Sequence, residues 1–216
     1  MTQRETATKI IVGNVELEGN LTLPNDAKGI VLFAHGSGSG RFSPRNQYVA
    51  KIFNASKIGT LLFDLLTREE EEIDVATAEY RFNIGLLAER LVGVTKWLKK
   101  DTQTSSYKFA YFGASTGAAA ALIAAAKLPA DIAAVVSRGG RPDLAGDYLS
   151  SVVAPTLLLV GGLDRQVILL NRQAMDKMTN EKKLEIIPGA THLFEEPGKL
   201  EVVAKLSTDW FLRFLR

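Results

Sequence analysis

Short, unbroken apolar runs alternate with segments of helical period along most of this 216-residue chain. Apolar runs of this kind are typical of strands that are buried on both faces of a parallel sheet. The runs lie at residues 29–34, 59–64, 107–112, 132–136, 155–160 and 184–187, and the helical segments lie at 44–56, 78–99, 116–128, 167–179 and 200–215. Strand alternating with helix this often predicts an α/β fold, with helices on both faces of a mostly parallel sheet.

The N-terminal part of the chain shows a different pattern. Apolar and polar residues alternate at 9–12 and 15–23, which predicts two antiparallel strands joined near Gly13 and a sheet of about eight strands in all. Residues 65–79 follow one of the apolar runs, and we expect them to line part of the entrance to a site at the carboxyl ends of the strands. We expect the acidic run at 69–72 to face solvent. Too few residues separate 136 from 155 for an inserted cap domain, and the length and 46% hydrophobic content predict one domain over residues 1–216.

Composition narrows the classes of function. The chain has no cysteine, so it can have no disulfide, thiolate metal site or cysteine nucleophile. Its two histidines are far apart and show no metal-binding spacing, so we expect no metal. The net charge is +2 without a basic arm, and no apolar segment is long enough to span a bilayer, so we expect no nucleic-acid or membrane partner and a cytoplasmic location.

One glycine-flanked serine follows a central apolar run. The segment Gly113-Ala114-Ser115-Thr116-Gly117 fits the Gly-x-Ser-x-Gly pattern of a nucleophile elbow. Small residues on both sides allow the chain to turn sharply from a strand into a helix and expose the serine hydroxyl. Ser115 is therefore the candidate nucleophile, although tight turns favour small residues for structural reasons as well.

A serine nucleophile requires a base and a carboxylate that orients the base. His192, which follows the last apolar run, is the candidate base, and Asp164, which follows the run before it, is the candidate carboxylate. The order Ser115, Asp164, His192 is that of the α/β-hydrolase fold. Taken alone, Asp164 is equally suited to cap the helix that follows, and His192 to lie in a surface loop.

The loop after the run at 29–34 is rich in glycine and serine, as His35-Gly36-Ser37-Gly38-Ser39-Gly40. An oxyanion hole requires two backbone N–H donors, and we expect them from Thr116 and Ser37. Gly36 lies beside Ser37, where the backbone can approach a substrate closely. We expect His35 to brace this turn and not to transfer protons.

Three arginines lie where they could reach the site. Arg138 and Arg141, at the end of the run at 132–136, could each bind a substrate carboxylate in a bidentate manner. The alternative is a salt bridge that braces neighbouring loops, for example to Asp143 or Asp147. For Arg41 we expect a solvated position.

With these residues located, the chain resembles the α/β hydrolases, and more narrowly the small capless enzymes that are similar to dienelactone hydrolase. The residues that carry the resemblance lie at 34–38, 113–117, 137–142, 160–164 and 188–192. The resemblance implies a Ser-His-Asp esterase or lactonase that needs no cofactor. Dienelactone hydrolases proper use a cysteine nucleophile, which this chain lacks, so the resemblance implies ester hydrolysis and not dienelactone activity in particular.

We therefore expect a carboxylic-ester hydrolase that acts on a small ester or lactone through an acyl-enzyme, as a monomer or homodimer. Two alternatives remain open at this point. One is acyl transfer on amide, thioester or peroxide acceptors with the same residues. The other is a non-catalytic protein that binds a small ligand on the same fold, because fold and motif do not determine turnover.

Overall fold

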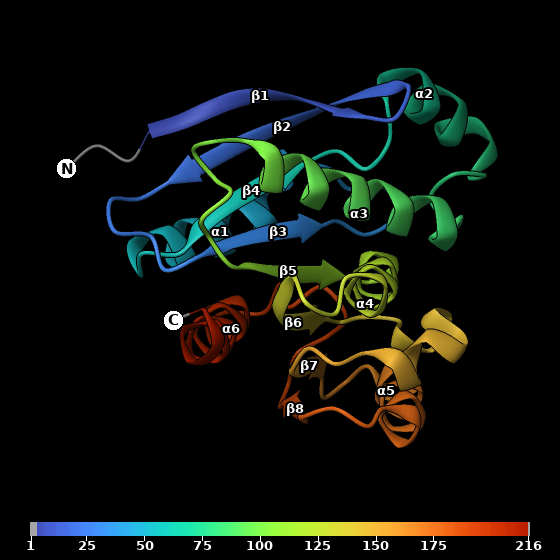
Figure 1. Ribbon diagram of the computed structural model, residues 1–216. Coiled ribbons are helices and arrows are strands. Elements are labelled where there is room, and N and C mark those ends of the chain that lie inside the picture. Colours follow the sequence, from blue (N-terminus) through green and yellow to red (C-terminus); the bar gives the residue numbers. More distant parts are fainter. Residues whose placement is uncertain (1–3, 216) are drawn as a thin grey trace.

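The structure, a computed structural model, describes residues 4–215 (Figure 1). Eight strands form one sheet in the order β1-β2-β4-β3-β5-β6-β7-β8. The strands are β1 (Arg4–Val12), β2 (Val15–Leu23), β3 (Ile30–Ala34), β4 (Gly59–Phe63), β5 (Phe109–Ala114), β6 (Ile132–Arg138), β7 (Thr156–Gly161) and β8 (Lys182–Ile187). Strands β3 to β8 run parallel, whereas β1 pairs antiparallel with β2 and β2 pairs antiparallel with β4.

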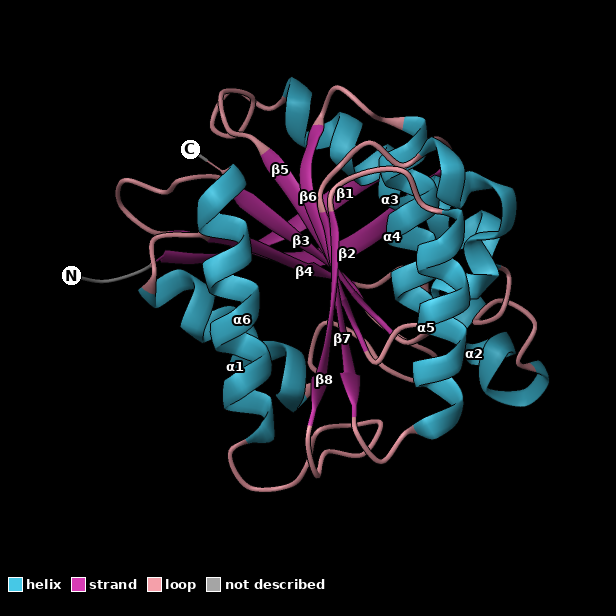
Figure 2. Ribbon diagram, turned by 90° about the horizontal axis from the view of Figure 1, so that it is seen from below, coloured by secondary structure: helices cyan, strands magenta, loops and turns pink. Residues whose placement is uncertain are grey.

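Helices cover both faces of the sheet (Figure 2). They are α1 (Pro44–Ala55), α2 (Arg68–Thr77), α3 (Ile84–Lys100), α4 (Thr116–Lys127), α5 (Arg165–Lys177) and α6 (Lys199–Phe214), with a 3-10 segment, η1 (Pro142–Ser151), between β6 and β7. Figures 1 and 2 place α1 and α6 on one face and α2 to α5 on the other. This is the α/β-hydrolase fold that the sequence predicts, and the segment between β6 and β7 holds only η1.

Each face of the sheet has its own apolar core, because alternate residues of a strand point to opposite faces. On the face of α1 and α6, the rings of Phe33, Phe53 and Phe112 lie with centroids 5.0 to 5.7 Å apart. On the other face, α4 packs against the sheet with ten consecutive buried residues, 116–125, mostly alanines. Small side chains allow this helix to lie close to the strands that carry the site.

The carboxyl ends of the parallel strands meet at one edge, as the strand register shows. Ala34 at the end of β3 lies beside Gly113 of β5, and Ala114 lies beside Arg138 at the end of β6. Gly161 at the end of β7 pairs with Ile187 at the end of β8. Ligands of open parallel sheets bind at this edge, so the loops that follow these strands define the candidate site.

The segment after β4 differs from the expectation. Residues 68–77 form α2, which the sequence analysis did not predict as a helix, and α3 begins at Ile84 and not at residue 78. A capping box starts α2, because the Thr67 hydroxyl accepts the Glu70 N–H while the Glu70 carboxylate accepts the Thr67 N–H. Ala78, with φ of 57°, ends it. Across residues 4–215, no helix combines the length and apolar character needed to cross a membrane.

Candidate active site

Ser115 occupies a strained turn between β5 and α4. Its φ of 49° and ψ of −122° lie in a region that residues other than glycine rarely adopt. Three backbone hydrogen bonds hold the turn: the Ser115 N–H donates to the carbonyl of Arg138 at 3.3 Å, and the Ser115 carbonyl accepts the N–H groups of Ala118 at 3.1 Å and Arg141 at 3.0 Å. Strain that is held by its surroundings in this way is typical of a nucleophile elbow.

The flanking glycines are required by close backbone contacts. A Cβ atom at Gly113 would lie 2.5 Å from the Cα of Ala118, and one at Gly117 would lie 2.2 Å from the carbonyl oxygen of Ala34. At Gly36, a Cβ atom would lie 2.9 Å from the Cβ of Ser115. The glycines thus allow the elbow and the loop after β3 to approach each other.

The loop after β3 brings the two candidate oxyanion donors together. The hydroxyl of Ser37 lies 3.0 Å from that of Thr116. Thr116 is the first residue of α4, so its N–H has no acceptor within the helix. For the Ser37 N–H, no acceptor occurs among residues 4–215. Both N–H groups are therefore available to a ligand beside Ser115.

His192 and Asp164 form the second half of the site. The Nδ1 atom of His192 lies 2.7 Å from Oδ2 of Asp164, and the two side chains are 39% and 16% exposed. Asp164 also caps α5, because its Oδ1 accepts the Val167 N–H at 3.5 Å. With the Nδ1 proton donated to Asp164, Nε2 of His192 is left as an acceptor.

Ser115 and His192 both lie against the same segment, at the end of β6 and in the loop after it. Within the described part of the chain, no hydrogen bond joins the Ser115 hydroxyl to His192. The end of β6 and the loop after it contact both residues: the backbone groups of Arg138 and Arg141 bond to the backbone of Ser115, and a Cβ atom at Gly139 would lie 3.6 Å from Cε1 of His192. Hydrogen bonds between catalytic groups are often long in ligand-free structures.

His35 has structural contacts at both ring nitrogens. Its Nε2 accepts the Leu65 N–H at 3.0 Å, and its Nδ1 lies 3.1 Å from the carbonyl oxygen of Gly36, to which it donates. Burial lowers the pKa of His35 below its ordinary value. The neutral ring thus braces the loop after β3 against the segment after β4.

The three arginines named from the sequence differ in their contacts. Arg141 donates two hydrogen bonds to Asp143, at 2.8 and 2.7 Å, as in the bracing alternative. Arg41 was expected to be solvated, which is wrong: its guanidinium is only 15% exposed and pairs with Asp64 and Glu18, since β2, β4 and the loop after β3 meet there.

Arg138 is buried, and its Nε and Nη1 atoms have no partner among the described residues. Burial and the like charge of Arg45 lower the pKa of Arg138 to about 10. Of the two arginines expected to reach a substrate carboxylate, Arg141 pairs with Asp143, whereas Arg138 forms no ion pair with any residue in 4–215.

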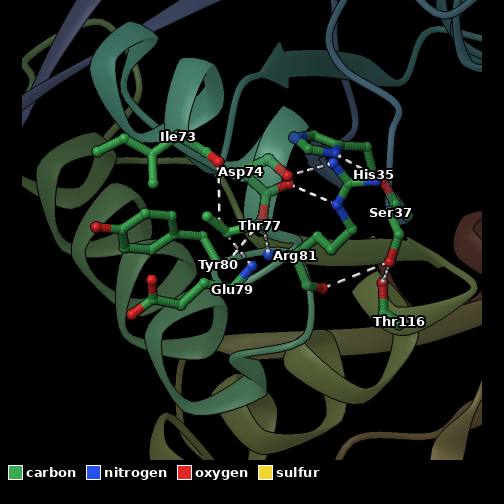
Figure 3. A network of polar contacts seen from close by, with 10 residues as sticks. His35, Ser37, Ile73, Asp74, Thr77, Glu79, Tyr80, Arg81 and Thr116 are labelled. Carbon is green, nitrogen blue, oxygen red and sulfur yellow. Dashed lines mark hydrogen bonds and ion pairs between the residues drawn. The ribbon is translucent and has the colours of Figure 1, made fainter.

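A polar network on α2 was missed by sequence reasoning (Figure 3). The buried carboxylate of Asp74 accepts the N–H groups of Tyr80 and Arg81, both at 2.8 Å, and Nε of Arg81 at 2.6 Å. Burial would raise the pKa of Asp74, but these bonds outweigh it and lower the pKa. The carbonyl of Arg81 in turn accepts the Ser37 hydroxyl at 3.4 Å, so the network ties α2 to the loop after β3.

Acidic and histidine side chains do not gather into a metal-binding group anywhere in residues 4–215. The residues brought together at the sheet edge are a strained serine, two free N–H donors and a histidine paired with a carboxylate. This set can activate an oxygen nucleophile and stabilise an oxyanion.

Three features are together those of an α/β hydrolase: the order of the strands in the sheet, the strained turn at Ser115 and the pairing of His192 with Asp164. The model of the dienelactone hydrolase family matches residues 54–215. The chain belongs to the dienelactone hydrolase family.

Known structures agree with this assignment. A dienelactone hydrolase from Anabaena variabilis is 57% identical, with a TM-score of 0.99 and full coverage of both chains. The protein Est1E from Butyrivibrio proteoclasticus is 17% identical with a TM-score of 0.79, the match covers 96% of this chain and 98% of that one, and it shows the fold alone.

A curated protein of Mycobacterium tuberculosis with the name "Putative phosphoribosyl transferase" is 54% identical over 212 residues, which make up 98% of this chain. The match covers 47% of that protein, so the chain spans about half the length of this curated relative. Its name therefore describes a protein about twice as long as the matched region.

Proposed function

We propose that the chain is a serine hydrolase that cleaves small carboxylic esters or lactones through an acyl-enzyme. The observation that carries this proposal is the strained backbone of Ser115, which lies at the same sheet edge as the His192–Asp164 pair. Membership of a hydrolase family supports it independently.

Acylation begins when the Ser115 hydroxyl attacks the ester carbonyl and Nε2 of His192 takes its proton. Asp164 holds the ring orientation and stabilises its charged form. The carbonyl oxygen becomes an oxyanion, which accepts the N–H groups of Thr116 and Ser37. When the intermediate collapses, the C–O bond to the alcohol breaks, and His192 gives the proton to the leaving oxygen.

Deacylation repeats these steps with water. His192 takes a proton from the water, the hydroxide attacks the acyl carbon, and Ser115 leaves with the proton returned by His192. The products are a carboxylic acid and the alcohol, or one hydroxy acid when the substrate is a lactone. No step requires a metal or an organic cofactor.

A non-catalytic ligand-binding protein is the second candidate, because within residues 4–215 the Ser115 hydroxyl has no hydrogen bond to His192. Cleavage of an amide or a thioester would use the same residues with a different leaving group. Acyl transfer to a peroxide would use them with a different nucleophile in the second step. Comparing ester, amide and thioester substrates at equal concentration separates these reactions.

Labelling with a fluorophosphonate probe, read by intact mass, tests the proposal. We expect one adduct on the wild type, none on Ser115→Ala, and an adduct on the control Ser105→Ala, which changes an exposed loop serine. Hydrolysis of p-nitrophenyl acetate should follow the same pattern. An unlabelled wild type that is stabilised thermally by small esters would favour the binding protein instead.

A further inference from the structure

A cavity of about 150 Å³ lies beside the loop after β3, residues 35–39, which carries the proposed oxyanion donor Ser37. Residues 35–39 form one wall, and the rest of the lining comes from α2, α3 and the segments that flank α2. Its apolar lining comes from Leu66, Val75 and Leu87. These three apolar residues take no part in the steps described above, whereas Ser37 on the opposite wall is one of the proposed oxyanion donors.

The cavity and the base lie on opposite sides of the nucleophile. In the sheet, β3 and β4 are on one side of β5, which carries Ser115, while β7 and β8 are on the other. The cavity is lined by residues that follow β3 and β4, whereas Asp164 follows β7 and His192 follows β8. The loop that carries Ser37 joins the cavity to the turn at Ser115, because the Ser37 hydroxyl contacts both Thr116, which follows Ser115, and the carbonyl of Arg81 on the cavity wall (Figure 3).

The reaction geometry then decides which half of an ester faces the cavity. His192 must give a proton to the leaving oxygen, so the alcohol half lies toward β7 and β8. The carbonyl oxygen points to the N–H groups of Ser37 and Thr116. The acyl chain, on the remaining side of the carbonyl carbon, extends toward β3 and β4.

We propose that this cavity is the acyl subsite and that it selects a short, uncharged acyl group. The inference rests on the proposed ester hydrolysis. A cavity of about 150 Å³ is large enough for a benzene-sized group, so butyryl and benzoyl groups fit within it, against Leu66, Val75 and Leu87, and an octanoyl chain does not.

Charge on the cavity wall supports an uncharged acyl group. Three carboxylates line the cavity, of which Asp64 pairs with Arg41 and Asp74 pairs with Arg81. Glu71 forms no ion pair with any of the described residues. An acyl group with a terminal carboxylate would meet this negative charge at close range.

The test compares p-nitrophenyl esters of acetate, butyrate, benzoate, octanoate and hemisuccinate. We expect the wild type to prefer butyrate and benzoate. Val75→Trp places an indole at the cavity mouth, and since Val75 is 76% exposed, the fold should tolerate it. We expect kcat/KM for butyrate and benzoate to fall by roughly 10-fold or more while acetate changes little.

Val153→Trp is the matched control, because Val153 is also exposed, at 63%, but lies outside this cavity. For acetate esters of longer alcohols, kcat/KM should be the same in the wild type and in Val75→Trp. Glu71→Gln should raise the relative rate for the hemisuccinate ester.

The outcomes separate this inference from the proposed function. Turnover that depends on Ser115, with the same acyl profile in Val75→Trp as in the wild type, would overturn the assignment of the cavity alone. Turnover that survives in Ser115→Ala would overturn the proposed hydrolysis and the subsite with it.

Discussion

Replacing Gly117 by alanine should greatly lower the activity, although the substitution changes none of the polar side chains of the proposed site. A Cβ atom there would lie 2.2 Å from the carbonyl oxygen of Ala34 and 2.4 Å from that of His35, whereas real Cβ atoms essentially never approach closer than 3.0 Å. Backbone must therefore move by about 0.8 Å (3.0 minus 2.2). The moving parts are α4, which carries Thr116, and the loop that carries Ser37.

Two effects of this shift can be estimated. Overpacking of this kind costs about 1–3 kcal/mol of unfolding free energy. A displacement near 1 Å can lower the rate by about 100-fold, because the oxyanion donors leave the position of the developing charge. We therefore expect Gly117→Ala to fold with a lower Tm and to lose roughly 100-fold in kcat/KM.

The assay is p-nitrophenyl acetate hydrolysis together with thermal unfolding. Gly85→Ala is the control, because a Cβ atom at Gly85 in the first turn of α3 meets only Asn83 at 3.6 Å, an ordinary contact. The control should keep full activity and gain a little stability. A Gly117→Ala variant with wild-type Tm and activity would refute the steric reasoning.

Two further predictions concern charge. Asp164→Asn should lower kcat/KM for p-nitrophenyl acetate by about 10⁴-fold, because asparagine favours the wrong tautomer of His192. The Tm should change little, because asparagine still caps α5. Asp209→Asn, at a surface ion pair, is the control, and an equal loss of activity there would contradict the assignment of Asp164. Burial lowers the pKa of His35, so below pH 6.5 the unfolded chain binds a proton that the folded chain does not, and stability should fall by up to about 1.4 kcal/mol per pH unit until the folded pKa is reached. Denaturant unfolding between pH 8 and 5 should show a flatter pH dependence for His35→Asn than for the wild type, and parallel curves would show that His35 does not contribute.

The sheet and the positions at its edge could be predicted because they depend on local pattern. Buried parallel strands are encoded as unbroken apolar runs, and the residue after each run is carried to the same edge. This is why Asp164 and His192, 28 positions apart, could be expected to lie together, and the 2.7 Å contact between them agrees.

Helix α2 could not be predicted in the same way. It has one buried residue, Asp74, so it lacks the apolar periodicity that identifies an amphipathic helix. Its stability comes from the capping box of Thr67 and Glu70 and from acidic residues in its first turn, which suit the helix dipole. The pattern Thr-x-x-Glu was the one available signal.

Ion pairs between residues that are far apart in the sequence could not be predicted either. The partners of Arg41 are Glu18 and Asp64, each 23 positions away in opposite directions along the chain. Choosing between solvent and such partners requires the register of β2 against β4. That register depends on packing over the whole face and not on the residues around Arg41.

The sequence predicts that side chains of the segment from Ser137 to Arg141 could contact the substrate. In the structure, it is the backbone of this segment that contacts the site residues. It bonds to both the N–H and the carbonyl of Ser115, while Gly139, with φ of +50°, lies against the backbone of His192. Gly140 has no room for a side chain, because a Cβ atom there would lie 1.9 Å from Oγ of Ser137. Because this segment contacts both the proposed nucleophile and the proposed base, the two glycines matter to the proposed chemistry even though neither one supplies a reacting group.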